Sequence, residues 1–536
     1  MQNVLYYGDN LDVLREHVKD ETVDLVYLDP PFNSNATYNI LFKERDGSDS
    51  AAQIEAFKDT WHWDERAERT FAEVMDAGGK VSELLRAIRQ SLGTNDMFAY
   101  LTMMAPRLVE LRRVLKDTGS VYLHCDPTAS HYLKLLMDAV FGPRNFRNEI
   151  VWKRQSAHSD ATRFGRVHDV LLFYGKSENA TWSSTYQPYD TDYVEQYYRF
   201  RDPDGRRFMS GDLGAAGLQG GGYTYEWRGV TRLWRCPIST MQEYEKQGRI
   251  YYTKNGFPRL KRYLDESRGM PAQDVWADIE SLRSWHAERL HYQTQKPEAL
   301  LERIIRASTN EGHTVLDPFC GCGTTVAVAQ KLNRCWIGID ITYRAIGLIR
   351  RRLKEAHEGE IDVAKTYTVV GIPTTIPDAQ QLATEKPLQF QSWALDLVPG
   401  TSENPRKSRD RAIDGVAYFD KSGKRKRDGT IYFSVKSGGH VGVTDVRELA
   451  SAVTRDDADI GVLISLHKPS PDAMKEAVEM GFFEAPWGGR FRKIQIITIA
   501  QLLQGKKIDF PMSITNTLKR APKHVDLGHD QASLDF

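Results

Sequence analysis

Apolar and polar positions along the first 360 residues follow a rhythm typical of strands that alternate with helices. Val23–Leu28 is a short strand-forming run, and Met97–Lys116 repeats apolar residues at helical spacing before Ser120–His124 returns to a strand pattern. Farther along, the pattern predicts strand, helix, strand and helix at residues 314–316, 324–332, 335–339 and 343–356. Such alternation predicts an α/β domain in which helices cover both faces of a parallel sheet.

Between residues 176 and 290 this rhythm fails. The stretch holds 19 aromatic residues in 115 positions, against an aromatic content of 10% in the whole chain. Loops and modules mounted on a rigid scaffold commonly carry recognition. We therefore expect residues 176–290 to be a recognition insertion within a first domain that covers residues 1–370.

A second domain is expected after a linker at residues 371–387, GIPTTIPDAQQLATEKP, which holds three prolines among small polar residues. Within residues 388–515 the pattern predicts a second α/β unit. Its expected order is helix, strand, strand, helix, strand, helix and strand, at residues 390–397, 412–419, 430–436, 444–453, 460–466, 472–480 and 493–498. Residues 516–536 have the composition of a polar tail.

Composition and charge are those of a soluble globular protein. Hydrophobic residues make up 41% of the chain and charged residues 27%, and no apolar run approaches the roughly 20 residues that span a bilayer. The first ten residues lack a basic segment followed by an apolar one, so we expect a cytoplasmic location and no membrane partner. The 72 basic and 72 acidic residues cancel, so net charge neither requires nor excludes a nucleic-acid partner. The five cysteines show no CxxC spacing, which argues against a disulfide framework or structural zinc.

The first candidate for chemistry is the segment Asp29, Pro30, Pro31 and Phe32, which directly follows the strand Val23–Leu28. The exocyclic amino group of adenine or cytosine is a poor nucleophile because its lone pair is delocalised into the ring. The Asp29 carboxylate and the Pro30 carbonyl can each accept one amino hydrogen, and two prolines stiffen the loop. Phe32 offers a face for a base taken out of a helix, a contact of about 1 to 3 kcal/mol. A simple strand-ending turn is the alternative interpretation.

The second candidate lies about 290 residues downstream, where another strand runs into Asp317 and a turn with Gly321 and Gly323. The two glycines allow a ligand to approach the backbone closely, and the helix that follows offers amide donors to a carboxylate. The next strand ends at Asp340, which is placed to accept hydrogen bonds from ribose hydroxyls.

A dinucleotide site is the competing interpretation of this turn. Val326 stands where the GxGxxG pattern requires its third glycine, which argues against it. Cys320 and Cys322 are explained more simply as loop residues than as metal ligands, because no partner ligands accompany them.

With both motifs considered together, the chain resembles the β-class amino-directed DNA methyltransferases, in which the catalytic motif precedes the cofactor motif. The resemblance covers roughly residues 1–360. Its pieces, in order, are Gly8-Asp9-Asn10 with Leu14, Asp29-Pro30-Pro31-Phe32-Asn33 with Tyr38, Gly119–Asp126, Asn148–Lys153, His168–Tyr174, and Gln295-Lys296-Pro297 with Leu301.

The resemblance implies a Rossmann-like fold with permuted motif order, S-adenosylmethionine as cofactor and a catalytic loop at Asp29, Pro30, Pro31 and Phe32. The residues it implies for cofactor binding are Asp317, Phe319, Gly321, Gly323, Thr324, Asp340 and Lys296. An acid at the first catalytic position favours N6 of adenine, with N4 of cytosine as the alternative. RNA or a protein glutamine is a further alternative substrate.

The same resemblance implies duplex DNA as the partner and the aromatic insertion as its target-recognition region. Basic side chains of the insertion are candidates for contacts to phosphates or guanine edges, namely Arg201, Arg206, Arg207, Arg228, Arg232 and Arg235. A restriction subunit or a second copy of the chain would be a further partner in a restriction-modification or defence system.

Residues 387–510 resemble restriction-endonuclease-like domains of the Mrr type, on the segments Arg409–Val416 and Tyr432–Gly438. The resemblance implies that Asp414 and Lys436 belong to a Mg²⁺ site for cleavage. Ser434 stands where an acid or amide is usual, and Gln391 where a glutamate is frequent, which implies a weakened site. Cleavage, DNA binding without cleavage and a purely structural role all remain open.

Overall fold

The structure is a computed structural model. It describes residues 2–31, 63–155, 162, 164–215, 222–283, 285–290, 292, 294–357, 362–398, 401–403, 413–419, 429–485, 489–510 and 514–515. The chain forms two compact units, Met1–Ser183 together with Asp274–Phe536, and Ser184–Gln273. Within these ranges no helix is long and apolar enough to cross a membrane.

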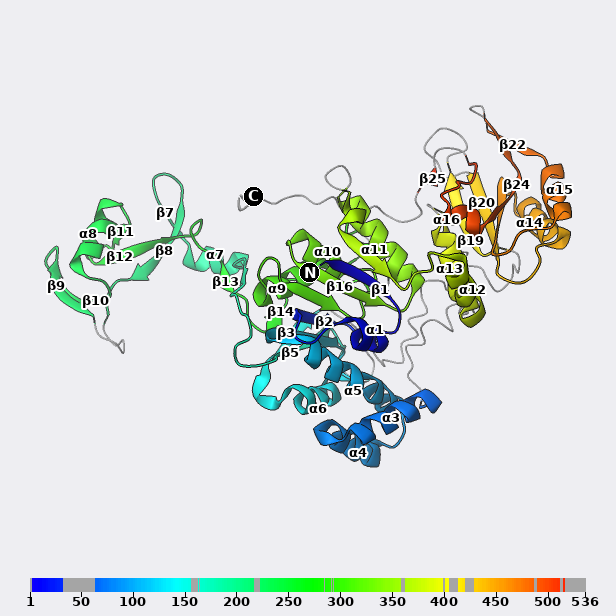
Figure 1. The fold of residues 1–536 in the computed structure, drawn as a ribbon. Coiled ribbons are helices and arrows are strands. Elements are labelled where there is room, and N and C mark those ends of the chain that lie inside the picture. The colour runs from blue at the N-terminus through cyan, green and yellow to red at the C-terminus, as the bar shows by residue number, and fades with distance from the viewer. Residues whose placement is uncertain are drawn as a thin grey trace. The chain divides into compact units, whose positions relative to one another are not determined.

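A nine-stranded sheet is the centre of the N-terminal part of the first unit (Figure 1), in the order β14-β4-β5-β3-β2-β15-β16-β1-β17. The strands are β1 (Asn3–Tyr7), β2 (Val23–Leu28), β3 (Leu115–Cys125), β4 (Phe146–Lys153), β5 (His168–Gly175), β14 (Val275–Trp276), β15 (Thr314–Asp317), β16 (Cys335–Asp340) and β17 (Tyr367–Val370). All neighbours pair in parallel except β5, which is antiparallel to β3 and β4. The expected parallel sheet is therefore mixed, since an antiparallel strand needs no helical crossover.

Helices cover both faces of this sheet, as the sequence predicts. The helices on the sheet are α1 (Asn10–His17), α5 (Asp96–Val114), α6 (Ser130–Phe141), α9 (Glu298–Ser308), α10 (Thr324–Lys331) and α11 (Tyr343–Ala356). Two more, α3 (Glu65–Ala77) and α4 (Gly79–Leu92), pack on α5 and α6. Helix α5 ends two residues earlier than expected, because Leu115 already belongs to β3.

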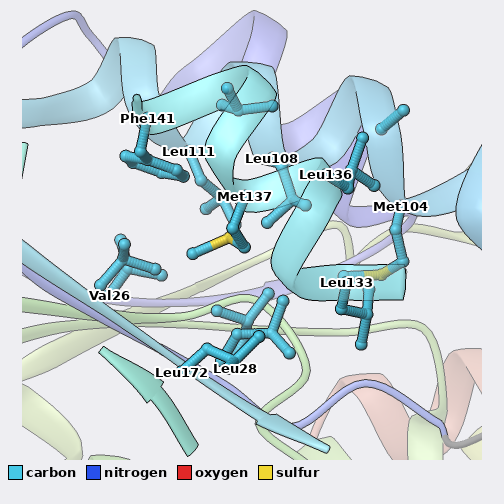
Figure 2. Close-up of a cluster of buried hydrophobic side chains, with 14 of the residues drawn as sticks. Val26, Leu28, Met104, Leu108, Leu111, Leu133, Leu136, Met137, Phe141 and Leu172 are labelled. Atoms are coloured by element: carbon cyan, nitrogen blue, oxygen red, sulfur yellow. The ribbon is translucent and has the colours of Figure 1, made fainter. Parts of the chain in front are cut away.

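Strand β2 shows why both faces must be covered. Val26 and Leu28 pack in one cluster with α5 and α6 (Figure 2), whereas Leu25 and Tyr27 belong to a cluster on the other face with α9, α10 and α11. Successive side chains of a strand point to opposite faces, so every residue of β2 is buried. This burial fixes the position of the residues that follow the strand.

The inserted unit, Ser184–Gln273, is narrower than the 176–290 segment expected from composition. Its strands are β6 (Tyr186–Gln187), β7 (Phe200–Arg201), β8 (Arg207–Asp212), β9 (Tyr223–Trp227), β10 (Val230–Trp234), β11 (Ile250–Tyr252), β12 (Pro258–Tyr263) and β13 (Met270–Pro271), and its helices are α7 (Thr191–Tyr197) and α8 (Ile238–Lys246). A four-stranded sheet β11-β12-β8-β7 and the hairpin β9-β10 are its main features. From Asp274 the chain belongs to the first unit again, where β14 pairs with β4 and Trp276 is buried.

The C-terminal part has its own sheet, β18-β19-β20-β21-β24, with β25 beside β19. Its strands are β18 (Ser402–Glu403), β19 (Gly415–Phe419), β20 (Gly429–Lys436), β21 (Ile460–Ser465), β22 (Phe482–Glu484), β23 (Arg490–Arg492), β24 (Ile494–Thr498) and β25 (Ile514–Thr515), and its helices are α12 (Ile376–Glu385), α13 (Pro387–Asp396), α14 (Val443–Arg455), α15 (Pro471–Glu479) and α16 (Ile499–Leu503). The predicted helices and strands are present, with the start of the 412–419 strand at Gly415.

The segment 371–387, expected to be a linker, contains the helix α12. Thr375 caps this helix, Pro377 occupies its first turn, and Ala379 and Leu382 are buried in the cluster that includes Trp393 of α13. Proline is accepted in the first turn of a helix, so a proline-rich composition here does not exclude one. The expected polar tail, residues 516–536, lies outside the described residues.

Candidate active site

The strand order brings the two sequence motifs together at one edge of the sheet. Strand β15 pairs in parallel with β2, Val315 opposite Leu25, and with β16, Asp317 opposite Gly338. The carboxyl ends of the three neighbouring strands therefore carry Asp29, Asp317 and Asp340. In open parallel sheets, ligands bind at this edge.

A cavity of about 350 Å³ lies at this edge. The predicted site residues that line it are Asp29, Pro30, Pro31, Lys296, Asp317, Phe319, Gly321, Thr324 and Asp340. Gly323 does not line it, and Phe32 lies outside the described residues. The cavity is thus bounded on one side by the predicted catalytic loop and on the other by the predicted cofactor turn, and its volume is that of a small-molecule site.

Two left-handed glycines shape the turn between β15 and α10. Gly321 has a φ of 49° and Gly323 a φ of 73°. A Cβ at Gly323 would lie 2.6 Å from Cγ1 of Ile349, so the position accepts no side chain. Gly323 is the N-cap of α10. Its role is therefore to allow the turn, because it does not line the cavity.

Asp317 and Asp340 hold the turn from inside. Asp317 accepts hydrogen bonds from the Phe319 amide at 3.0 Å and the Thr325 hydroxyl at 2.6 Å. Asp340 accepts from the Gly321 amide at 2.9 Å and the Thr342 amide at 2.8 Å. Each carboxylate is thus both a structural acceptor and a wall of the cavity.

Burial makes these two carboxylates hard to ionise. Burial, helped by the neighbouring charges of Asp29 and Asp340, raises the pKa of Asp317 to about 7, although hydrogen bonds from Thr325 and Phe319 lower it. It raises the pKa of Asp340 to about 6 despite the bonds from Thr342 and Gly321. A cationic ligand in the cavity would favour the ionised form of both.

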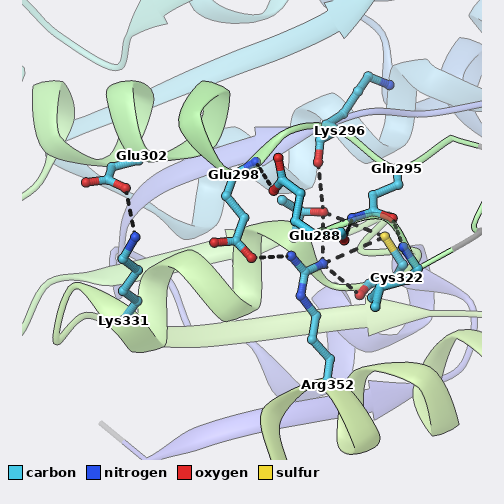
Figure 3. Close-up of polar contacts among 10 residues, drawn as sticks. Glu288, Gln295, Lys296, Glu298, Glu302, Cys322, Lys331 and Arg352 are labelled. Atoms are coloured by element: carbon cyan, nitrogen blue, oxygen red, sulfur yellow. Dashed lines mark hydrogen bonds and ion pairs between the residues drawn. The ribbon is translucent and has the colours of Figure 1, made fainter. Parts of the chain in front are cut away.

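Lys296, predicted to bind the cofactor, forms an ion pair with the catalytic candidate Asp29. Figure 3 shows how its segment is fixed to the cofactor turn: the Lys296 carbonyl accepts from the Thr324 hydroxyl at 3.2 Å. The buried Arg352 donates to Thr324 at 3.1 Å and to Glu298 at 2.6 Å. The backbone of Lys296 is therefore held while its side chain reaches Asp29.

Several cavity residues were not singled out as site residues from the sequence. Arg107 is buried and donates to both oxygens of Asp9, at 2.9 and 3.1 Å, and to Asn10 at 2.6 Å. All three line the cavity. The resemblance includes Gly8-Asp9-Asn10. Its partner Arg107 lies in a helix almost 100 residues away, and no local sequence pattern indicates that contact.

In the inserted unit, half of the arginines predicted to contact DNA form ion pairs with acidic side chains. Arg206 pairs with Asp265 at 2.7 Å, Arg207 pairs with Glu195 at 3.1 Å, and Arg228 pairs with Glu245. Arg201, Arg232 and Arg235 are exposed. Within the described part of the chain these three form no ion pair, so they are the better candidates for phosphate contacts.

In the C-terminal part, the candidates Asp414 and Lys436 each have partners within the domain. Asp414 accepts a hydrogen bond from the Gln391 amide and another, at 2.6 Å, from the Val435 backbone. Lys436 instead pairs with Asp445 of α14 at 3.1 Å. Among the described residues, no group of three or more His, Cys, Asp or Glu side chains is placed to hold a metal ion. The predicted Mg²⁺ site stays a prediction.

The mixed α/β sheet, with a glycine turn and acids at the carboxyl ends of β15 and β16, defines a Rossmann-like methyltransferase fold. The family comparison identifies it further: a model described as DNA methylase matches residues 23–351. The chain belongs to this N6/N4 DNA methylase family. A second model, described as restriction endonuclease, matches residues 382–504.

Curated relatives agree with this assignment. The Type III restriction-modification enzyme StyLTI Mod subunit of Salmonella typhimurium is 30% identical, over 62% of this chain and 50% of its own length. The Type II methyltransferase M.EcaI of Enterobacter cloacae is 31% identical, over 47% of this chain and 57% of its own. The chain thus spans about half the length of these relatives.

Among solved structures, a DNA modification methylase of Thermus thermophilus complexed with S-adenosyl-L-methionine is 14% identical, with a TM-score of 0.33, and the match covers 68% of this chain and 97% of that one. The cytosine-N4-specific PvuII DNA methyltransferase is 13% identical, with a TM-score of 0.33, over 69% of this chain and 95% of its own.

Proposed function

We propose that this chain transfers a methyl group from S-adenosylmethionine to N6 of adenine in duplex DNA. The observation that carries the proposal is the cavity that Asp29 and Pro30 share with the turn at Gly321 and with Asp340. The two motifs lie almost 300 positions apart in the sequence but line one cavity. This arrangement suits a reaction in which a methyl donor and its acceptor meet between them.

The residues around the cavity fit S-adenosylmethionine. The cofactor carries two cationic groups, the sulfonium and the ammonium, and one carboxylate, so its net charge is positive. A positive ligand suits a cavity lined by Asp29, Asp317 and Asp340. Asp340, at the end of β16, is placed to accept hydrogen bonds from the ribose hydroxyls. The N-terminus of α10 offers amide donors to the cofactor carboxylate. When bound, the cofactor supplies an electrophilic methyl group.

Asp29 and Pro30 orient the amino group that receives this methyl. The Asp29 carboxylate accepts one amino hydrogen and the Pro30 carbonyl the other, so that the nitrogen lone pair is turned toward the donor. The Lys296 ammonium already holds Asp29. A carboxylate has about four acceptor sites, so this ion pair leaves capacity for the substrate. Phe32, next in sequence, would stack on the extruded base.

The choice of adenine N6 over cytosine N4 rests on the acid at position 29. Methylation of cytosine N4 would use the same geometry, because both bases present an exocyclic amino group beside a ring nitrogen. We therefore keep cytosine as the second candidate, to be separated by the products.

For DNA binding we propose the inserted unit, residues 184–273, as the reader of the target sequence. Exposed Arg201 and Arg232 and its many tyrosines are side chains suited to phosphates and bases. We propose that the restriction-endonuclease-like part also binds DNA, without efficient cleavage, because Ser434 stands where an acid or amide is usual and supplies no charge to a metal ion. Together, the two parts fit a restriction-modification or defence role.

The test is to express the chain in a host without DNA methylation and to analyse the nucleosides of its DNA by mass spectrometry. We expect N6-methyladenine, absent from cells that carry Asp29→Ala. N4-methylcytosine would instead support the second candidate. An absence of both, with folded protein that binds S-adenosylmethionine, would rule out DNA amino methylation.

A further inference from the structure

Three buried polar side chains lie in line behind the cavity and have no part in the function proposed so far. Tyr27, on β2, lines the cavity and its hydroxyl lies 2.9 Å from Nδ1 of His124 on β3. Nε2 of the same imidazole lies 3.2 Å from Oδ2 of Asp169 on β5. The three side chains are 2%, 0% and 1% exposed.

The adjacency of three strands produces this line. Strand β2 pairs with β3, Tyr27 opposite Tyr122, and β3 pairs with β5, His124 opposite Leu171. Residues two apart on a strand share a face, so His124 lies on the face of Tyr122 and Tyr27, and Asp169 on that of Leu171. None of the three residues is near another in sequence.

The hydrogen-bond directions follow from the chemistry of the end group. Burial raises the pKa of Asp169, but the hydrogen bond from His124 and the charges of Lys296 and Arg154 outweigh it and keep this pKa below its ordinary value. An ionised carboxylate only accepts, so Nε2 carries the imidazole hydrogen and Nδ1 offers a lone pair. The Tyr27 hydroxyl therefore donates to His124, and its own lone pairs remain for the cavity.

Methylation of an amino group creates a need for such a chain. When the nitrogen forms its bond to the methyl carbon it becomes cationic, and it must lose a proton to give the neutral methylamino product. The Pro30 carbonyl is a weak base, and Asp29 is held by the Lys296 ammonium. The site needs another proton acceptor close by.

We propose, resting on the methyltransferase function above, that Tyr27, His124 and Asp169 form the relay that accepts this proton. An N–H bond of the methylated amino group breaks and an O–H bond forms at Tyr27, while the original Tyr27 proton passes to Nδ1 of His124. The Asp169 carboxylate stabilises the imidazolium, as the aspartate does in a Ser-His-Asp triad, with Tyr27 in the place of the serine. After product release the proton returns through Tyr27 to water.

Other charged groups surround the relay and must be distinguished from it. Asp29 and Asp317 act on Tyr27 from the cavity side. Arg154 lies 3.6 Å from Asp169, and Lys296 acts on the same carboxylate. A bound cofactor engages the cavity carboxylates, so measurements at saturating S-adenosylmethionine isolate the relay from Asp317.

Tyr122 provides a matched control on the same sheet face. It is equally buried, at 1% exposure, and its hydroxyl bonds to Ser308 at 2.8 Å instead of to the relay. Tyr122→Phe and Tyr27→Phe each remove one buried hydroxyl from neighbouring strands. Loss of packing or of a buried hydrogen bond should affect the two variants alike.

The experiment is single-turnover methyl transfer to unmethylated genomic DNA, with enzyme in excess and saturating S-adenosylmethionine. We expect Tyr27→Phe to slow transfer about 100-fold with unchanged cofactor affinity, and Tyr122→Phe to slow it less than about threefold. His124→Gln should slow transfer as Tyr27→Phe does, and the double variant should be no slower than the slower single variant, because residues that act as a unit are not additive.

Asp169→Asn keeps an acceptor for Nε2 but removes the charge, so it should slow transfer even where His124→Gln folds poorly. Equal rates for Tyr27→Phe and Tyr122→Phe, or losses that add in the Tyr27→Phe/His124→Gln double variant, would overturn the relay. A wild-type chain that methylates neither adenine nor cytosine would overturn the proposed function itself, whereas a fully active Tyr27→Phe would overturn the relay alone.

Discussion

Lys296 and Asp29 form an ion pair across the cavity although 267 positions separate them in the sequence. Their side chains are 12% and 14% exposed, so water screens the pair only weakly. The pair joins the segment that precedes the cofactor motif to the catalytic loop. A residue expected to serve the cofactor is therefore also a partner of the catalytic acid, and this double position can be tested.

Asp29→Ala should abolish methyl transfer and leave the affinity for S-adenosylmethionine nearly unchanged. Asp29 acts on the target amine, and loss of its hydrogen bond cannot be made good by alanine. Transfer is measured with tritiated cofactor and affinity by calorimetry, with the exposed Glu16→Ala as control. Activity above a few per cent of wild type would contradict the role given to Asp29.

Lys296→Met should lower methyl transfer about tenfold, because the Asp29 carboxylate loses the ammonium that holds it. The control is Lys331→Met, which breaks the ion pair with Glu302 of α9 at 3.2 Å (Figure 3). A loss that is explained entirely by weakened cofactor binding would assign Lys296 to the cofactor alone.

Asp317→Asn should stabilise the cofactor-free chain at pH 8 but not at pH 5. Because the pKa of Asp317 is raised to about 7 in the folded state, the folded state binds the proton more tightly than the unfolded state. Stability from this group is thus present at low pH and is lost as the pH rises through 7, by on the order of 2 kcal/mol. Denaturant unfolding of both proteins at both pH values measures the difference. An equal effect of the substitution at pH 5 and pH 8 would contradict it.

Exchange of residues 184–273 for the corresponding unit of a relative should change which sequence is methylated and leave cofactor affinity unchanged. The unit forms its own sheets and its own small core around Trp234. Methylation-sensitive long-read sequencing of host DNA identifies the modified site before and after the exchange. Unaltered specificity would place target recognition in the large sheet or its loops.

Cleavage of unmethylated DNA in the presence of Mg²⁺ should be slow or undetectable, since Ser434 supplies no charge to a hard cation. Any cleavage should vanish in Asp414→Ala and Lys436→Ala, with methylation intact. Gel analysis of plasmid DNA with Mg²⁺ or EDTA gives the rates. Rapid cleavage by the unmodified chain, or cleavage that survives Asp414→Ala, would show that other residues make the metal site.

Much of the fold follows from local pattern. The runs at 23–28, 314–316 and 335–339 are strand-forming and each is followed directly by an acid, and the glycines at 321 and 323 allow a tight turn before a helix. Apolar residues that repeat every two positions in strands and every 3.6 positions in helices are a local property of the sequence. The same repeats therefore also predicted the helices and strands of the C-terminal part. The same local reasoning misread residues 371–387, where prolines suited to a helix start suggested a linker.

Pairings between distant segments were decided only in three dimensions. That Lys296 reaches Asp29, that Arg107 holds Asp9, and that Tyr27, His124 and Asp169 stand in line all depend on which strands become neighbours. The antiparallel direction of β5 and the return of the chain to the large sheet at β14 likewise follow from strand pairing. Sequence spacing fixes which side chains share a strand or helix face, whereas the free energy of packing the whole sheet selects the partner across it.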